Sequence, residues 1–342
     1  MILLFKKTQE YIFNYYDNNI AFSKLADFYY LFENIRKIKA TNYPFTNFSS
    51  SDKIEKITFL IATQSKGLLL YSNGEIIQLF NKKGFYGITR HNHVFFAFYK
   101  TGLHGNIISF KLKNNQAINV KVIITGLSRG VHQIDFIGNN LYVTNTYDNS
   151  ILIYNNAYKK ENIHWRDYNN IIYPNEKLHD GRKSNNYNHF NSIFQYREKL
   201  YLIAHNETKK TKRKSEVYTI ETKNPTTLKK EIINGSNCHN IYIDDKTKIY
   251  CKSLEGIVSI NEQDSISHEG IFTRGLSVTN THIIIGGSEI QTNREKRKYT
   301  NGYIYIYNLK LQLIQTISIS KTQIQEIKMI KNEKTFSNYT EE

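Results

Sequence analysis

Cysteine, proline and long apolar runs are scarce in this chain. Only 2 Cys and 3 Pro occur in 342 residues, and Cys238 and Cys251 are too few for a disulfide framework or a zinc site made of thiolates. No stretch approaches the roughly 18 consecutive apolar residues of a transmembrane helix, so we expect no membrane span. The start, MILLFKK, has too short an apolar run for a signal peptide, and its lysines follow that run. These absences favour a cytoplasmic protein.

Motifs for nucleotides and nucleic acids are missing as well. The sequence has no P-loop and no GxGxxG fingerprint, so we expect no nucleotide cofactor. It has no zinc-finger spacing, RNP motif or helix-turn-helix signal, and we therefore do not expect a nucleic-acid partner. The net charge of +16 nevertheless suits an anionic ligand, unless it only reflects a general enrichment in lysine. The placement of the basic residues has to decide between these explanations.

What the chain does contain is a repeated strand pattern. The 26 Tyr favour strands, and period-two alternation of apolar residues recurs along the chain. Six segments share a polar residue, an apolar residue two positions later, and a second apolar strand about nine positions later. They begin at Tyr86, His132, Asn191, His239, Arg274 and Gln325, at intervals of 35 to 59 residues. Most continue with a third strand, such as SILIYN, and several with a more polar fourth, such as LKKEIIN.

Units of four antiparallel strands at this spacing are typical of propeller blades. The last segment, from Gln325, lacks outer strands of its own, whereas residues 57–80 contain outer strands without a clear inner one. Joining the two closes a ring without a free edge. The sequence therefore predicts an all-β, six-bladed β-propeller closed by pairing of N- and C-terminal strands. A β-sandwich is the alternative, but it gives no reason for one chain end to complete the other.

The domain boundaries follow from this arrangement. Residues 1–50 include apolar residues at spacings of three and four, and we expect a short helical extension there. Residues 51–331 are predicted to form the propeller, and residues 332–342 a polar tail.

In a propeller, the first residue of each inner strand lies at one mouth of the central channel. The repeat therefore gathers one polar residue from each blade at the same place: Tyr86, His132, Asn191, His239, Arg274 and Gln325. The connectors into the inner strands add His189, and the ends of the second strands add His205, Asn145 and Asp148. We predict a ligand site at this mouth, and its binding residues are predicted to be Tyr86, Asn145, Asp148, Gln325 and Arg294.

Four of the gathered residues are histidines from three consecutive blades: His132, His189, His205 and His239. Imidazole suits Zn, Fe, Cu or Ni better than Ca or Mg. We therefore expect these histidines to bind a divalent transition metal, Fe or Zn. The alternative is that they only line the channel and hydrogen-bond the blades together.

Two basic runs occupy the same place in their blades. KKTKRK, residues 209–214, and NREKRK, residues 293–298, each link the second strand to the third and so flank this mouth. We expect them to attract an anionic ligand, unless they are only solvated loops of a lysine-rich chain.

Three segments together resemble an uncharacterised bacterial family of six-bladed propellers. NYNHFNSIFQ contains the family's H-x-N-[GS] pattern, NCHNIYIDD is similar to a later blade that opens with His, and FTRGLSV is similar to its R-G-L-[AS] strand. The positions that match are His189, Asn191, His239, Arg274, Gly275, Leu276, Ser288, Arg294 and Glu295, all within roughly residues 130–310. The resemblance implies the fold and the residues at the mouth, but no particular reaction. Lactonase-like and NHL propellers, which the chain resembles more distantly, hold a metal or a ligand at the corresponding mouth.

Two functions follow as hypotheses. The first is a metal-dependent hydrolase, lyase or oxygenase for a small anionic substrate bearing a carboxylate, phosphate or sugar-like group. In it Arg274 and Asn191 act in catalysis, and the guanidinium fork of Arg274 binds or polarises the anionic group. The alternative is a non-catalytic propeller that binds an acidic glycan or a protein partner through its basic face. The sequence indicates neither the reaction nor the oligomeric state.

Overall fold

The computed structural model describes residues 38–51, 57–102, 104–175, 184–222, 228–293 and 296–330. The chain divides into two compact units, residues 1–39 and 40–342, and only the second is considered below. The helical extension expected near the start lies almost entirely outside the described residues, as do the polar tail and Arg294. Among the described helices, none has the length and apolar character needed to cross a membrane.

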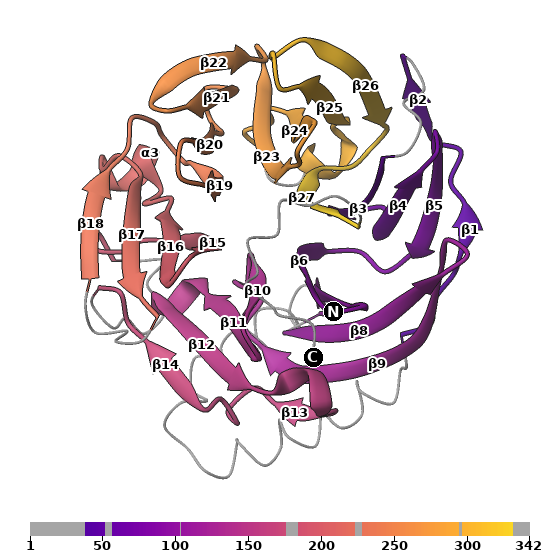
Figure 1. The fold of residues 1–342 in the computed structure, drawn as a ribbon, viewed down its shortest axis with the longest axis horizontal. Coiled ribbons are helices and arrows are strands. Elements are labelled where there is room, and N and C mark those ends of the chain that lie inside the picture. The colour runs from indigo at the N-terminus through magenta and orange to yellow at the C-terminus, as the bar shows by residue number, and fades with distance from the viewer. Residues whose placement is uncertain are drawn as a thin grey trace, which may run out of the picture. The chain divides into compact units, whose positions relative to one another are not determined.

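The second unit is a six-bladed β-propeller, as predicted (Figure 1). Its innermost strands surround a central axis in the order β27 (Ile324–Met329), β6 (Phe85–His91), β10 (Ile134–Ile137), β15 (Phe190–Tyr196), β19 (His239–Ile243) and β23 (Ile271–Val278).

Further strands build each blade outward from its inner strand. On β27 these are β3 (Thr58–Thr63), β4 (Leu68–Ser72), β5 (Glu75–Phe80) and β1 (Tyr43–Pro44). On β6 they are β7 (Val94–Lys100), β8 (Gly105–Lys113), β9 (Gln116–Leu127) and the parallel β13 (Ile163–His164). On β10 they are β11 (Asn140–Asn145), β12 (Ser150–Asn155) and β14 (Asn170–Ile172).

The other three blades follow the same plan. On β15 lie β16 (Lys199–Ala204), β17 (Glu216–Glu221) and β18 (Leu228–Ile232). On β19 lie β20 (Lys248–Lys252), β21 (Ile257–Ile260) and β22 (Gln263–Ser267). On β23 lie β24 (His282–Glu289), β25 (Gly302–Asn308), β26 (Leu313–Ile319) and β2 (Phe48–Ser50). The short helices in the connections are η2 (Thr146–Asp148), η3 (Ala157–Lys159), α3 (Thr208–Thr211) and η5 (Lys296–Tyr299).

The two ends of the chain close the ring. Strand β27 pairs antiparallel with β3, with Ile327 opposite Ile61, so the C-terminal strand completes the first blade as predicted. The N-terminal segment adds β1 to the edge of that blade and β2 to the edge of the last one. The propeller unit accordingly begins at residue 40 and not at 51. Strands of 2 and 3 residues are too short to show alternation in a sequence, so the strand pattern predicts the start of the propeller about ten residues too late.

Apolar side chains pack between adjacent blades and hold the ring together. Phe59, Ile61, Ile304 and Ile327, which come from the first and last blades, belong to one core cluster and are buried. Complete burial of such a side chain stabilises the fold by about 1.5–3 kcal/mol. The ring therefore closes by apolar packing as well as by strand pairing.

The inner strands give the central channel two different mouths. At the mouth where they begin, the predicted site residues gather, and we call it the histidine mouth. The hairpins that follow the inner strands form the opposite mouth, where a cavity of about 980 Å³ opens. Phe194 and Arg197 line this cavity, and none of His132, His189, His205 and His239 does.

Candidate functional site

A β-bulge opens five of the six inner strands. Register shifts fall between Phe85 and Ile88, Phe190 and Ser192, His239 and Ile241, Thr273 and Leu276, and Ile324 and Glu326. The residues in these bulges include Tyr86, Asn191, Asn240, Arg274 and Gln325. A bulge bends the strand and redirects a side chain, and bulges are common beside functional sites. His239 lies two residues before the paired Ile241, as Arg274 lies two residues before the paired Leu276, so the two positions are equivalent, as predicted.

One hydrogen bond crosses the channel axis at the histidine mouth. Arg274 Nη2 donates to His132 Nδ1 at 2.8 Å. Arg274 lies on β23 and His132 directly precedes β10, and these strands are three blades apart in either direction around the ring (Figure 1). The bond therefore spans the channel axis at the histidine mouth.

The histidines form a continuous row from this bond outward. The centroids of His132 and His189 are 4.8 Å apart, those of His189 and His205 are 4.5 Å apart, and those of His205 and His239 are 5.0 Å apart. Tyr86 lies against His132 at the other end of the row, with centroids 5.7 Å apart. The structure therefore brings together Arg274, Tyr86 and all four predicted histidines.

The hydrogen bonds determine where each ring in the first half of the row carries its proton. Arginine has only donors, so His132 Nδ1 accepts and the neutral ring carries its proton on Nε2. That proton faces His189 Nε2 at 3.1 Å. His189 then carries its own proton on Nδ1, which lies 3.4 Å from Glu207 Oε1. Two hydrogen bonds thus lead in one direction from Arg274 to His189, whose Nδ1 faces the Glu207 carboxylate.

The other two histidines have opposite tautomers. His205 Nδ1 accepts the backbone N–H of Glu207 at 3.1 Å, so its proton is on Nε2. His239 Nδ1 lies 2.9 Å from the carbonyl of Asn237 and therefore carries the proton, which leaves the Nε2 lone pair open. Side by side, the two rings present one N–H donor and one acceptor.

Burial keeps these histidines neutral. It lowers the pKa of His132, His205 and His239 well below the ordinary value of 6.5, and neighbouring imidazoles and Arg274 add to the effect. Burial also lowers the pKa of His189, against the opposing influence of Glu207. At neutral pH the row carries no positive charge of its own.

Cations gather beside Tyr86. Lys100 Nζ lies 3.7 Å from the centroid of the Tyr86 ring and Arg274 Cζ lies 5.4 Å from it. Burial alone would raise the pKa of the phenol, but Lys100, Arg274 and the exposed Arg129 outweigh it and lower this pKa. Within the part of the chain that the structure describes, no ion pair joins Lys100, Arg129 or Arg274 to a carboxylate.

The backbone is strained where the row meets solvent. His189 has φ 53° and Glu207 has φ 44°, in the left-handed region that residues other than glycine rarely adopt. Such conformations cost of order 1–3 kcal/mol each and often occur at functional sites. Here they bring the His189 ring and the Glu207 carboxylate to face each other.

The four rings, as they are hydrogen-bonded, do not fit one metal ion. A nitrogen that carries a proton cannot bind a metal, and this excludes His132 Nε2 and His205 Nε2 as ligands in the tautomers described above. His239 does have the usual arrangement of a ligand, with Nδ1–H on a carbonyl and Nε2 open. Among the described residues, no group of three or more His, Cys, Asp or Glu is placed to hold a metal. A metal on His132 would require Arg274 to leave it.

The other predicted site residues have different surroundings. Asn191 Nδ2 donates to the carbonyl of Cys238 at 2.9 Å, a bond between blades that occupies the amide. Asn145 Nδ2 donates to Asp148 Oδ2 at 2.8 Å and to Ser150 Oγ at 3.1 Å, which engages the amide within its own blade. Gln325 is 4% exposed, and its Oε1 has no hydrogen-bond partner among the described residues. It lies on β27, between the strands of Arg274 and Tyr86.

Two residues of the candidate site, Lys100 and Glu207, were missed by the sequence-based prediction. Lys100 is the last residue of the second strand of its blade. Asn145 has the same position in the next blade, and His205 directly follows the second strand of the blade after that. Asn145 and His205 were predicted as site residues from these positions. The same rule could therefore have found Lys100. Glu207 lies two residues beyond His205, and no pattern in the sequence marks it.

The segment GLSRG, residues 126–130, matches the G-x-S-x-G pattern of α/β-hydrolase nucleophiles. That chemistry requires a strand, a sharp turn and then a helix. Here β9 ends at Leu127 and the chain turns toward β10 without a helix, while Ser128 Oγ accepts the N–H of Gly130 at 3.1 Å. Ser128 therefore lacks the context of a nucleophile.

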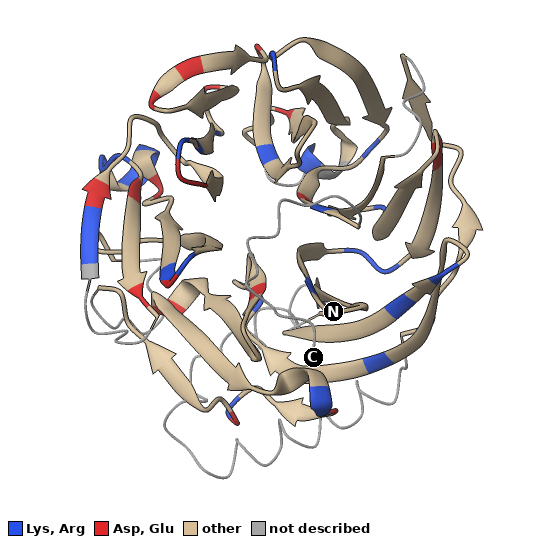
Figure 2. Ribbon diagram, in the orientation of Figure 1, with Lys and Arg blue, Asp and Glu red and all other residues tan. Residues whose placement is uncertain are grey.

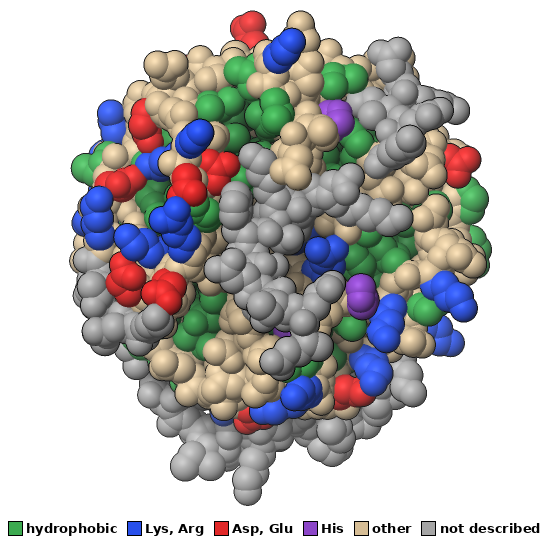
Figure 3. Space-filling model, in the orientation of Figure 1, with side chains coloured by type: hydrophobic (Ala, Val, Ile, Leu, Met, Phe, Trp, Pro, Cys, Tyr) green, Lys and Arg blue, Asp and Glu red, His purple; other side chains and the backbone are tan. Residues whose placement is uncertain are grey.

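The first basic run lies in the expected link. Residues 209–214 include most of α3 and follow β16, on the side of the histidine mouth. Lys209 and Lys210 are exposed, whereas Arg213 donates to Asn206 Oδ1 at 3.0 Å and pairs with Glu216 at 3.2 Å. On the neighbouring β18, a blue stretch is followed directly by a red segment (Figure 2). On the face that Figure 3 shows, Lys and Arg are likewise scattered among Asp and Glu.

Comparisons with known proteins support the fold. No family model matches the sequence, and no curated protein is similar to it, so the family resemblance stays a prediction. A chain in the crystal structure of a nidogen/laminin complex superposes with a TM-score of 0.55 at 11% identity, covering 80% of this chain and 98% of that one. A Lactobacillus plantarum protein gives 0.51 at 9% identity, covering 80% and 99%. A putative 6-phosphogluconolactonase from Bacteroides fragilis gives 0.50 at 10% identity, covering 82% and 98%. At these identities the likeness shows a shared propeller fold and nothing about a ligand.

Proposed function

We propose that the histidine mouth binds a small anion, a carboxylate or phosphate, between Lys100 and Arg274. The observation that supports this most directly is the pair of half-buried cations beside Tyr86 that lack a carboxylate partner among the described residues. A charge taken out of water without a partner is costly, and a bound anion would offset that cost. The guanidinium fork of Arg274 suits bidentate binding of either group.

The histidine row would recognise the remainder of such a ligand. His239 Nε2 is an open acceptor and His205 Nε2–H is a donor, so together they complement a hydroxyl group. The buried Oε1 of Gln325 supplies a further acceptor. The ligand class that fits is a hydroxylated anion, such as a sugar acid or sugar phosphate. The Bacteroides fragilis structure is that of a putative 6-phosphogluconolactonase, which agrees with this class without assigning the activity.

A transition metal is the competing candidate. The His239 Nε2 lone pair and its carbonyl-bound Nδ1–H support it, and His189 would join His239 once Arg274 released His132. Such a metal would supply a Lewis acid beside the bound anion. Elemental analysis of the purified protein distinguishes the two candidates, because the anion site requires no stoichiometric metal.

A calorimetric titration with inorganic phosphate tests the anion site. Wild type should bind one phosphate, and Lys100→Met should weaken this binding at least tenfold. Lys199→Met is a matched control, since Lys199 is exposed on β16 and begins that strand near the opposite mouth. Equal affinity in all three proteins would refute the proposal. A stoichiometric metal, with phosphate binding lost when it is removed, would favour the competing candidate.

A further inference from the structure

Lys100 brings a primary amine to the histidine mouth, in addition to a positive charge. It is the last residue of β7, and its Nζ lies 3.7 Å from the centroid of the Tyr86 ring. The residue is half-buried, so the amine is partly withdrawn from water while the residue keeps some exposure to solvent. A desolvated lysine beside other cations can act as a nucleophile, because its lone pair is more often free.

The groups around Lys100 favour loss of its proton. Tyr86 acts on it from β6, Arg274 from β23, and Arg129 from the connection that follows β9. Burial lowers the pKa of Lys100, and the two arginines add to this effect against the opposing influence of Tyr86. No carboxylate of the described ranges forms an ion pair that would hold the proton on Lys100.

Arg274 supplies the group that would hold a substrate beside this amine. Its Cζ lies 5.4 Å from the centroid of the same Tyr86 ring, so the guanidinium and the amine border one aromatic side chain. A guanidinium binds a carboxylate through two parallel hydrogen bonds. Gln325, on the strand between those of Arg274 and Tyr86, adds the buried Oε1 described above, which would accept from a hydroxyl group formed during a reaction.

We propose that Lys100 forms an imine with the carbonyl group of an oxo acid whose carboxylate lies on Arg274. This inference rests on the anion site proposed above and narrows its ligands to anions that also carry a ketone or an aldehyde, such as the oxo forms of sugar acids. The imine would make Lys100 a catalytic residue, since an iminium withdraws electrons from the neighbouring carbon and eases the breaking of a bond there.

The covalent step conserves the charge of the site. The Nζ lone pair attacks the carbonyl carbon, a C–N bond forms, and the carbonyl oxygen takes the proton that Lys100 releases. The resulting hydroxyl takes a second proton from the nitrogen and leaves as water, while the nitrogen lone pair forms the C=N bond. An ammonium and a carbonyl thus become an iminium and water, with no net uptake or release of a proton. Lys100 therefore stays cationic beside the carboxylate before and after the reaction.

Reductive trapping of the full chain tests the proposal. The protein is incubated at neutral pH with pyruvate or levulinate, and sodium cyanoborohydride reduces any iminium to a stable amine. The two acids place the ketone at different distances from the carboxylate, and the methyl ester of each keeps the ketone but removes the charge. Peptide mass spectrometry should show Lys100 labelled by at least one acid at least tenfold more than by its ester, and at least tenfold more than any other lysine.

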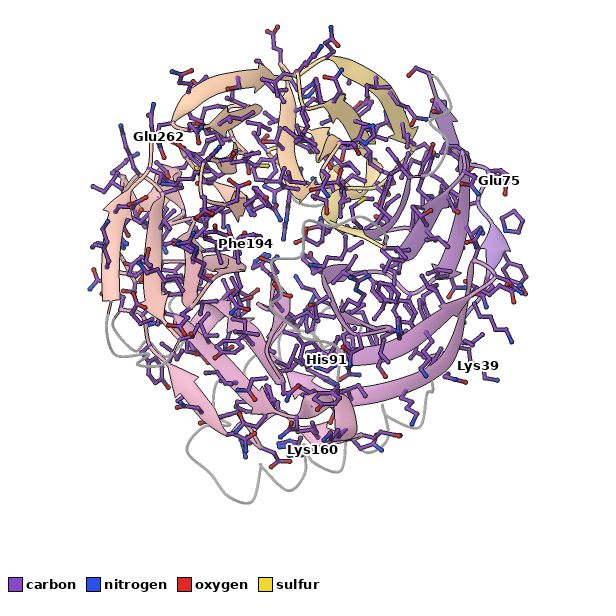
Figure 4. All side chains as sticks on the ribbon, viewed as in Figure 1. Lys39, Glu75, His91, Lys160, Phe194 and Glu262 are labelled. Atoms are coloured by element: carbon purple, nitrogen blue, oxygen red, sulfur yellow. The ribbon has the colours of Figure 1, made fainter. Side chains whose placement is uncertain are left out.

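Two variants locate the reaction. Lys100→Arg removes the amine and keeps a cation at this position, so the labelling should disappear. Lys160→Arg is the matched control, since Lys160 is exposed at the periphery of the ring (Figure 4), and it should leave the labelling of Lys100 unchanged. The comparison of acids with esters uses wild type alone, so it decides the matter even if Lys100→Arg does not fold.

The outcomes separate the imine from the anion site. Phosphate binding involves no covalent step, so phosphate binding without labelling of Lys100 would overturn the imine and leave the anion site standing. Equal labelling by the acids and their esters would also overturn the proposal, because Arg274 would then have no part in the reaction. Labelling spread over the exposed lysines would have the same consequence.

Discussion

The two mouths of the channel differ in how their polar groups are satisfied. At the opposite mouth, Arg197 pairs with Asp245, and Arg90 donates to a backbone carbonyl. At the histidine mouth, Lys100 and Arg274 approach the ring of Tyr86 without a described carboxylate partner, and His239 keeps an open lone pair. Arg197 and Arg90 are thus paired within the protein, whereas the unmatched charges of Lys100 and Arg274 are what the proposed anion site would require. Register shifts in five inner strands lie toward the histidine mouth, where a bulge redirects side chains such as those of Tyr86 and Arg274.

The bulges also explain how the histidine mouth stays ordered. Three backbone N–H groups in or beside the bulges donate to side chains of the neighbouring blade. Asn240 N–H donates to Ser192 Oγ at 2.7 Å, and Gly275 N–H donates to Asn240 Oδ1 at 2.8 Å. Ile193 N–H donates to Gln133 Oε1 at 2.6 Å. These bonds tie neighbouring blades together at the mouth without engaging Lys100 or Arg274.

The largest expected effect comes from removing one of these bonds between blades. Asn240→Leu would leave Gly275 N–H and the buried Glu326 without their partner, at about 1–3 kcal/mol for each group. Chemical denaturation should show a loss of about 2–5 kcal/mol in the free energy of unfolding. Asn139→Leu is the control at the opposite mouth, where the exposed amide contacts only His91, and it should cost less than about 0.5 kcal/mol. Equal losses would mean that the two mouths are held together alike.

The buried histidines and Glu326 should change the free energy of unfolding in opposite directions as the pH falls from 7 to 5. The histidines stay neutral in the folded protein, so their contribution is complete above pH 6.5 and is lost as the unfolded chain takes up protons below it. Burial raises the pKa of Glu326 to about 7 from 4.5, so its contribution is complete below pH 4.5 and is lost as pH rises through 7.

Denaturation between pH 5 and 7 separates these contributions. His205→Gln should make the loss of stability toward pH 5 shallower, and Glu326→Gln should make it steeper. A wild-type stability that does not change between pH 7 and 5, with both variants parallel to it, would mean that neither burial effect operates.

The fold could be predicted from the sequence because the strands missing at each end of the chain indicate how the ring closes. The segment at Gln325 has no outer strands and residues 57–80 have no inner one, and the structure joins them. Alternation of apolar residues also placed Tyr86, His132 and Arg274 at one mouth. It also placed His239 in register with Arg274, since each lies two residues before the first paired apolar residue that follows the bulge.

The hydrogen bonds within the site, and the histidine tautomers that they impose, could not be predicted from the sequence. The tautomers of the histidines depend on Arg274, which reaches His132 across the axis, and on the backbone N–H of Glu207. Neither relation leaves a pattern along the chain. The same holds for Arg213, which belongs to a lysine-rich run but pairs with the largely buried Glu216.

The smallest effect concerns that basic run. Changing Lys209, Lys210, Lys212 and Lys214 to Gln should leave the free energy of unfolding unchanged and weaken phosphate binding only a few-fold at low salt, because exposed charges act through a screened field. Arg213→Gln should instead lower stability by about 1–2 kcal/mol through its bonds to Asn206 and Glu216. Denaturation and low-salt calorimetry on both variants check this. If the four-lysine variant abolished phosphate binding, α3 and not Lys100 would hold the anion.

The position of a bound anion tests the central claim most directly. A crystal of the protein soaked in selenate, which has the shape and charge of sulfate, would report that position by its anomalous scattering. The account predicts one strong peak at the histidine mouth, within hydrogen-bond distance of Lys100 Nζ and the Arg274 guanidinium. A peak only on the exposed lysines of α3, or at the opposite mouth beside Arg90 and Arg197, would contradict it.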